Sequence, residues 1–283
     1  MLIVAVGCHD GEDGVIRIAT SIGQVRERYV NRVDAPKMGL YMIIRHSGSG
    51  WIMSDNPMRG EMSISDLIGP LNAVEQKRAP SRVFVQGDTL LARMPRVSIV
   101  GTREPSSQAI TQVKLIVEAL VAEDIVIVSG LARGVDTAAH RAAMMAGGRT
   151  IAVIGTPLDA CYPDENRRLQ EAIAQDHLLV SQFEPGTNIA PSNFPARNLT
   201  MALISDATII VEAGEKSGTR HQGWEAIRIG RPLFILEDVL VKSDISWARS
   251  MLEYGAQVLN PNDIESILDV LPVHGGSIEH VGF

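Results

Sequence analysis

The feature that most constrains the fold is a regular alternation of short apolar runs and helix-like segments, which starts at residue 97 and continues to residue 270. Apolar runs, rich in β-branched residues, predict strands over 97–100, 125–128, 150–154, 178–181, 207–211, 232–236 and 257–259. The intervening segments predict a helix capped by Ser106 or Ser107, then helices over 134–146, 164–175, 195–204, 219–229, 245–254 and 264–270. This alternation favours an α/β fold with a doubly wound, mostly parallel, Rossmann-like sheet.

The N-terminal part has a different pattern, with short mixed apolar runs and many glycines and arginines. It predicts a small N-terminal α+β domain over residues 1–75, followed by a polar link near residues 75–81. The Rossmann-like domain is then expected over residues 80–272, and a loose tail over 273–283. No apolar run approaches the roughly 18 residues of a membrane-spanning helix, and residues 1–7 are too short for a leader. We therefore expect a cytoplasmic protein with no membrane association.

Charge and cysteine content narrow the classes of function. Residues 1–96 carry 12 Lys and Arg against 10 Asp and Glu, whereas the remainder carries 14 against 23, a net charge of −9. A phosphate-binding site in the second part must therefore be a local basic patch on an acidic body. The two cysteines, Cys8 and Cys161, are far apart, which excludes a disulfide framework and a cysteine metal cluster.

The unusual residues collect where the predicted strands end, and ligands of parallel sheets bind at those ends. Gly101-Thr102-Arg103 follows the first strand, and either a simple turn or a site that faces phosphate explains these residues. Ser129-Gly-Leu-Ala-Arg-Gly134 ends the second, where glycines leave backbone N–H groups free for an anion and Arg133 adds a bidentate donor. A plain turn explains this stretch about equally well. The stretch is not the G-x-G-x-x-G fingerprint, so a nicotinamide cofactor is disfavoured.

Three further stretches carry weaker signals. Arg197-Asn198 lies near the start of a helix, where the helix dipole does not favour a cation, so either an anionic ligand or a surface ion pair explains it. Residues 216–221, Lys-Ser-Gly-Thr-Arg-His, suit either a phosphate or nucleotide, or a solvated turn. Asp136 and His140, one helical turn apart, are an acid/base pair or a contact to ligand, or more simply a helix-cap or packing pair. No residue has the spacing of a nucleophilic triad, so no catalytic residue, metal or cofactor is predicted.

Taken together, the runs resemble the DNA-processing protein A (DprA/Smf) family. The matching runs, in order, are "VFVQGDTLLARMPRVSIVGTR", "VSGLARGVDTAAHRAAMMAGGRTIAVIGTPLDACYPDENRRL", "NFPARN" and "ATIIVEAGEKSGT", within about residues 80–236. The resemblance implies an extended Rossmann fold that binds and protects single-stranded DNA without base preference and needs no catalytic residue. It also implies loading of a RecA-type recombinase, homodimerisation, and a role in DNA recombination, DNA uptake or natural transformation.

The resemblance also implies which residues bind the DNA backbone. It places Arg103, Arg133, Arg197 and Lys216 beside the phosphates, with glycines that allow close approach. The predicted DNA- or phosphate-binding site is Gly101, Thr102, Arg103, Ser129, Gly130, Arg133, Gly134, Arg197, Asn198, Lys216, Ser217, Gly218 and Thr219. The chain departs from the family pattern at Leu199, where a second arginine is usual, and at "RHQGWEA", where Thr-Ala usually follows the Ser-Gly pair.

An enzyme is the alternative class. The wider superfamily includes nucleotide-binding and phosphoribohydrolase proteins with a Gly-Gly-x-Gly-Thr-x-x-Glu signature. Gly218-Thr219 and Glu225 are faintly similar to it, although the spacing to the glutamate is wrong. Release of a free base from a nucleoside monophosphate would distinguish this class from a DNA-binding protein.

Overall fold

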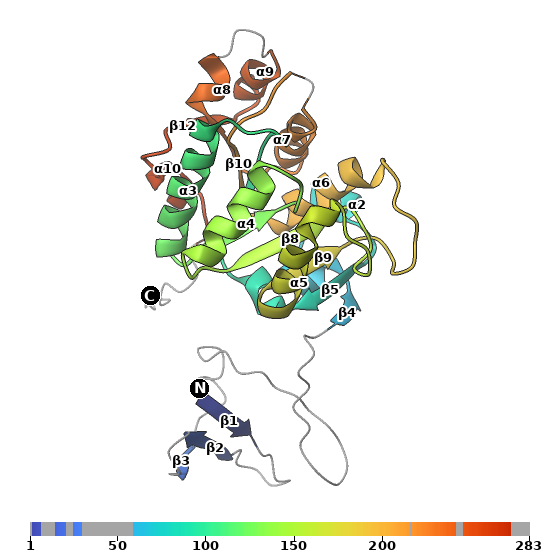
Figure 1. Ribbon diagram of the computed structural model, residues 1–283, viewed down its shortest axis with the longest axis vertical. Helices are drawn as coiled ribbons and strands as arrows, with labels where there is room; N and C mark the ends of the chain where they lie inside the picture. Colours follow the sequence, from blue (N-terminus) through green and yellow to red (C-terminus); the bar gives the residue numbers. More distant parts are fainter. Residues whose placement is uncertain are drawn as a thin grey trace, which may run out of the picture. The chain divides into compact units, whose positions relative to one another are not determined.

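The computed structural model divides the chain into two compact units, residues 1–53 and 54–283. It describes residues 59–215, 217–241 and 246–272, and the backbone of three strands near the N-terminus. These strands, β1 (Leu2–Val6), β2 (Val15–Thr20) and β3 (Val25–Tyr29), form an antiparallel sheet in the order β1-β2-β3 (Figure 1). The remaining residues of the predicted N-terminal domain before residue 59, and the predicted tail over 273–283, lie outside the described residues.

The larger unit is built on a nine-stranded sheet with the order β12-β11-β10-β6-β7-β8-β9-β5-β4 (Figure 1). Its strands are β4 (Arg59–Met62), β5 (Val83–Gly87), β6 (Arg96–Val100), β7 (Val126–Ser129), β8 (Thr150–Ile154), β9 (Leu178–Ser181), β10 (Ala207–Ile210), β11 (Leu233–Leu236) and β12 (Gln257–Leu259). The strands from β12 to β9 pair in parallel, and β5 and β4 add two antiparallel strands at the other edge. The predicted doubly wound, mostly parallel fold is confirmed.

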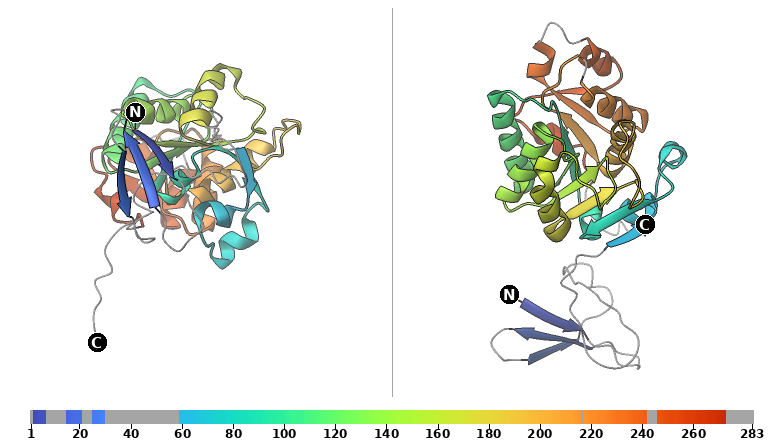
Figure 2. Two further views of the ribbon diagram at one scale, coloured as in Figure 1. Left: turned by 90° about the horizontal axis from the view of Figure 1, so that it is seen from below. Right: turned by 45° about the vertical axis from the view of Figure 1, so that its right-hand side comes forward.

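Helices cover both faces of this sheet, with α3, α4 and α5 on one side and α6 and α7 on the other (Figures 1 and 2). The helices are α1 (Ile64–Ile68), α2 (Ala73–Arg78), α3 (Ser107–Ala122), α4 (Val135–Met145), α5 (Arg167–Asp176), α6 (Asn193–Ile204), α7 (Thr219–Arg228), α8 (Glu237–Val241), α9 (Trp247–Glu253) and α10 (Glu265–Leu268). Every residue of β6 to β11 is buried, as expected for strands covered on both faces. Among the described residues, no helix has the length and apolar character needed to cross a bilayer.

The order of the strands determines where a ligand can bind. The chain enters the parallel sheet at β6 and winds outward through β7, β8 and β9. It then returns through α6 so that β10 pairs with the opposite side of β6, with Ala207 beside Val97 and Ile210 beside Val100. The connections that leave β6 and β10 therefore diverge, and a crevice forms at such a topological switch point.

The described segment that precedes the parallel strands belongs to the larger unit. Strand β4 pairs with β5, with Met62 beside Val83. On α2, Glu75 forms an ion pair of 2.7 Å with Arg231 and accepts a hydrogen bond from the backbone of Asn72 in a capping box. The sequence places the domain boundary near residue 75, whereas residues 59–78 pack with the nine-stranded sheet.

Candidate functional site

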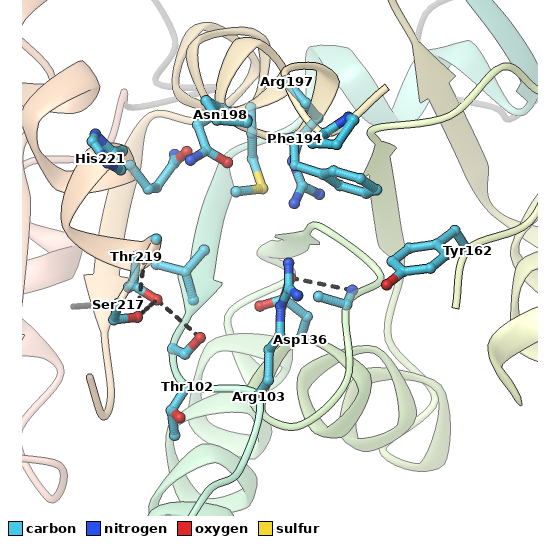
Figure 3. A pocket seen from close by; sticks show the side chains of 18 of the residues that line it. Thr102, Arg103, Asp136, Tyr162, Phe194, Arg197, Asn198, Ser217, Thr219 and His221 are labelled. Atoms are coloured by element: carbon cyan, nitrogen blue, oxygen red, sulfur yellow. Dashed lines mark hydrogen bonds between the residues drawn. The ribbon is translucent and has the colours of Figure 1, made fainter. Parts of the chain in front are cut away.

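A cavity of about 880 Å³ lies at the switch point, at the carboxyl ends of β6 and β10 (Figure 3). Its lining comes from the loop after β6, from the turn before α4 and the start of that helix, from the loop before α6 and the first half of that helix, and from the loop before α7 and the first turn of that helix. Tyr162, from the connection between β8 and α5, completes the wall. The cavity therefore brings together segments from residue 100 to residue 222, as predicted for the ends of parallel strands.

The loop after β6 forms hydrogen bonds with neighbouring segments on both of its sides. The backbone N–H of Thr102 donates to the carbonyl of Glu212 at 2.6 Å, and the Thr219 hydroxyl donates to the carbonyl of Gly101 at 2.9 Å. On the other side, the N–H of Val135 at the start of α4 donates to the carbonyl of Thr102 at 3.1 Å. Gly134 precedes α4 with a φ of 76°, and a Cβ there would lie 2.4 Å from the Thr102 carbonyl oxygen. The glycine is therefore required for this close contact.

Arg103 extends from this loop into the cavity, toward the space in front of Phe194 and Arg197 (Figure 3). Its side chain is exposed, and it forms no hydrogen bond or ion pair with any of the described residues. An exposed guanidinium without an acidic partner is available for a phosphate, which it can bind through two parallel hydrogen bonds.

Arg197 reaches the same cavity but is buried. Its Nη1 donates to the carbonyls of Gly130 at 2.5 Å and Val153 at 2.6 Å, which end β7 and β8. Gly130 makes room for it, because a Cβ there would lie 1.9 Å from Nη1. Burial lowers the pKa of Arg197, and the nearby Asp136 carboxylate opposes this change. Arg197 was predicted to contact DNA; in the structure it lines the cavity and its Nη1 also joins the ends of two strands.

Asp136 and His140 both lie on α4, but each has its own hydrogen-bond partner elsewhere. The Asp136 carboxylate accepts a hydrogen bond from the Ala132 N–H at 3.3 Å, and burial raises its pKa against the opposing effect of Arg197. His140 Nδ1 contacts the Thr150 hydroxyl at 2.7 Å, and burial lowers the pKa of His140 to about 3. This arrangement agrees with the packing interpretation of the pair. Asp136 nevertheless lines the cavity.

The structure brings together part of the predicted site. The cavity is lined by the predicted residues Gly101, Thr102, Arg103, Arg197, Asn198, Ser217, Gly218 and Thr219. Ser129 is buried below it and donates to the Ile99 carbonyl at 2.7 Å, while Gly130 and Gly134 act through the close contacts above. Arg133 is not among the lining residues, since its side chain, 58% exposed, pairs with Glu165 at 3.4 Å. Lys216 lies outside the described residues.

An aromatic pair in the cavity was not among the predicted site residues. The rings of Tyr162 and Phe194 lie 5.3 Å apart at an angle of 52°, and both residues line the cavity (Figure 3). Tyr162 is 47% exposed, so part of its surface is open to a ligand. Aromatic residues make up only 4% of the chain, and both of these occur in the runs "CYP" and "NFPARN". That scarcity was the available signal for a surface on which a base can stack.

Glu225, the glutamate on which the enzyme alternative depends, is held in ion pairs outside the cavity. Glu225 pairs with Arg78 on α2 and with Arg228 at 2.7 Å, and it is not among the residues that line the cavity. Gly218 and Thr219 line the cavity without it. The described geometry therefore does not place this carboxylate where a bound nucleotide would react.

Comparison with known proteins identifies the family. The model of the DNA recombination-mediator protein A family matches residues 63–272. The DNA processing protein DprA of Streptococcus pneumoniae is 39% identical over 197 residues, which cover 70% of each chain. DprA of Bacillus subtilis is 34% identical over 194 residues, which cover 68% of this chain and 65% of the relative.

Solved structures give the same result. The DprA structure from Streptococcus pneumoniae has a TM-score of 0.67 and 35% identity, and the match covers 76% of this chain and 75% of that one. DNA processing protein A of Helicobacter pylori, whose structure describes a single-stranded DNA binding mode, has a TM-score of 0.64 and 29% identity, with 77% and 99% covered. The fold, the site and these matches show that the chain belongs to the DNA recombination-mediator protein A family.

Proposed function

We propose that this chain binds single-stranded DNA in the cavity at the switch point and acts as a recombination mediator. The observation that carries the proposal is Arg103, an exposed guanidinium that extends into a cavity of about 880 Å³ and has no acidic partner among the described residues. Family membership supports the proposal, as does the single-stranded DNA binding mode of the Helicobacter pylori relative.

The chemistry of the cavity suits a single strand. Arg103 offers two donors to a phosphate, and the exposed part of Tyr162 offers an aromatic surface to a base. Stacking does not distinguish strongly among bases, so the binding is independent of sequence. Because the chain beyond residue 96 has a net charge of −9, no diffuse basic field replaces a lost local contact.

The proposal includes partners that rest on family membership. We expect transfer of the bound strand to a RecA-type recombinase, formation of a homodimer, and work in the cytoplasm during DNA recombination, uptake or natural transformation. Catalysis is not part of the proposal, because Glu225, the best candidate for the hydrolase alternative, is engaged by two arginines away from the cavity.

The test is fluorescence anisotropy of a labelled oligo-dT at several salt concentrations. Affinity should fall with salt with a log–log slope of about −0.7 for each phosphate neutralised. Arg103→Ala should weaken binding and make this slope shallower by about the value of one phosphate contact. The free energy of unfolding should change by no more than about 0.5 kcal/mol. Arg133→Ala is the matched control, since Arg133 is also exposed but is paired with Glu165 outside the cavity lining.

Two results would contradict the proposal. One is the absence of binding to oligo-dT at low salt. The other is a wild-type salt slope in Arg103→Ala together with a larger loss in Arg133→Ala, which would place the binding surface elsewhere.

A further inference from the structure

Gln222 on α7 is buried without hydrogen-bond partners. The residue is 1% exposed, and among the described residues neither its Nε2 nor its Oε1 has a partner. Leaving a buried donor or acceptor unpaired is unfavourable, so each such group in a folded protein requires an explanation. Gln222 also lines the cavity at the switch point, so a ligand that enters the cavity can provide the missing partners.

The position of Gln222 on its helix directs it toward the cavity. Residues three apart in a helix share a face, and Thr219, three residues earlier, lines the same cavity and bonds the Gly101 carbonyl. Asn198 on α6, also buried, adds a second carboxamide to the lining. The cavity therefore has a cationic group, Arg103, and a neutral amide group, Gln222, which matches the two chemical parts of a nucleotide.

A base satisfies the Gln222 carboxamide better than a phosphate does. The carboxamide carries both donors and an acceptor, whereas a phosphate oxygen can only accept and would leave Oε1 unpaired. The exposed edge of an unpaired base offers a donor beside an acceptor, and single strands are bound through such edges. The terminal torsion of glutamine is broad, so the amide can turn to present either order of donor and acceptor.

We propose that Gln222 docks one nucleobase of the bound strand, and that it requires the presence of a base without requiring a particular base. The inference deepens the proposed function and rests on it. It explains how a buried polar group is compatible with binding that is independent of sequence, because the amide can pair with any of the four bases and has no partner where the base is missing.

The experiment compares oligo-dT with an oligonucleotide of the same length in which every nucleotide is an abasic tetrahydrofuran, so that the phosphates are unchanged. Gln222→Met removes the amide and keeps a similar shape. It should weaken binding of oligo-dT about tenfold, in line with two lost hydrogen bonds. It should leave binding of the abasic strand unchanged, and the melting temperature should stay the same or rise, because an unpaired buried amide is gone.

Gln170→Met is the matched control. Gln170 is also a buried helical glutamine with an unpaired Oε1, but its Nε2 donates to the Ala160 carbonyl at 3.0 Å and it does not line the cavity. It should therefore leave both affinities at the wild-type values. In the wild-type protein, the side-chain amide resonances of Gln222 should shift with oligo-dT and remain in place with the abasic strand, which tests the proposal even if the variant does not fold.

The outcomes separate the two proposals. The docking role of Gln222 is overturned if Gln222→Met binds oligo-dT as the wild type does, if it weakens both strands equally, or if the amide resonances do not respond to oligo-dT. If the wild-type protein binds neither strand at low salt, the proposed function fails, and the docking role fails with it. If Gln222→Met loses affinity for oligo-dT but keeps its affinity for the abasic strand, both the proposed function and the docking role are supported.

Discussion

Replacement of Arg197 by methionine should destabilise the fold strongly, even though the residue lines a cavity proposed to bind DNA. The guanidinium is buried, donates to the carbonyls of Gly130 and Val153, and lies near the Asp136 carboxylate. Arg197→Met leaves both carbonyls and the buried carboxylate without this partner. Removal of one partner of a buried charge pair costs about 3–5 kcal/mol.

A loss of this size is measurable by urea unfolding and by thermal unfolding. For a domain of this size each kcal/mol of stability corresponds to about 2–4 °C in melting temperature, so the melting temperature should fall by roughly 10 °C. Arg103→Ala, an exposed arginine of the same cavity, should stay within about 0.5 kcal/mol of the wild type. The double variant Asp136→Asn with Arg197→Met should recover part of the loss, with a coupling energy of about 0.5–3 kcal/mol.

The reasoning is refuted if Arg197→Met unfolds at the same urea concentration as Arg103→Ala and the wild type. That result would mean that the two carbonyl hydrogen bonds and the proximity of Asp136 contribute little, and that Arg197 is a surface-like cation. A strictly additive double variant would refute the specific claim that Arg197 compensates the Asp136 charge.

Two further predictions concern buried histidine and glycine. Burial lowers the pKa of His140 from its usual value of about 6.5 to about 3, so the unfolded chain binds more protons between these pH values. Stability from this residue should be complete above about pH 6.5 and decline toward pH 3 by at most about 1.4 kcal/mol per unit, and His140→Leu should remove that part of the slope in urea unfolding at several pH values. Gly134→Ala should cost clearly more than Gly147→Ala in thermal unfolding, because both have a positive φ, 76° and 73°, but only a Cβ at Gly134 meets the Thr102 carbonyl. Equal losses would show that this contact is not restrictive; the strain of a positive φ alone is about 1–2 kcal/mol.

The parallel core could be predicted from the sequence because its strands are buried on both faces. Strands β8, β9 and β12 begin and end at the predicted residues, and Ser106 caps α3 by accepting from the Ala109 N–H as expected. The segments that were not predicted lack that pattern. Strand β5 is antiparallel and second from the edge, and α8 is a helix of only five residues directly after β11. Short elements whose conformation depends on their neighbours carry little periodic signal.

The location of the cavity could also be predicted, since parallel strands gather their carboxyl ends at one edge. The roles of the individual arginines could not. Arg103, Arg133 and Arg197 all follow or face strand ends, but one extends into the cavity, one pairs with Glu165, and one donates to carbonyls 67 and 44 residues away in the chain. A sequence shows that a charge is present, whereas its partners are decided by packing between distant segments.

The contrast between Arg197 and Gln222 shows how burial separates structural from ligand-binding groups in one cavity. Arg197 has two carbonyl partners for its Nη1 at the ends of two strands and a carboxylate nearby, although its Nε has no partner among the described residues. Gln222 is as deeply buried, but its amide has no partner among the described residues. Loss of the first should therefore reduce stability, and loss of the second should reduce affinity while stability is kept or improved. Opposite responses in one cavity follow from which buried groups already have partners within the protein, which neither charge nor residue type reveals in the sequence.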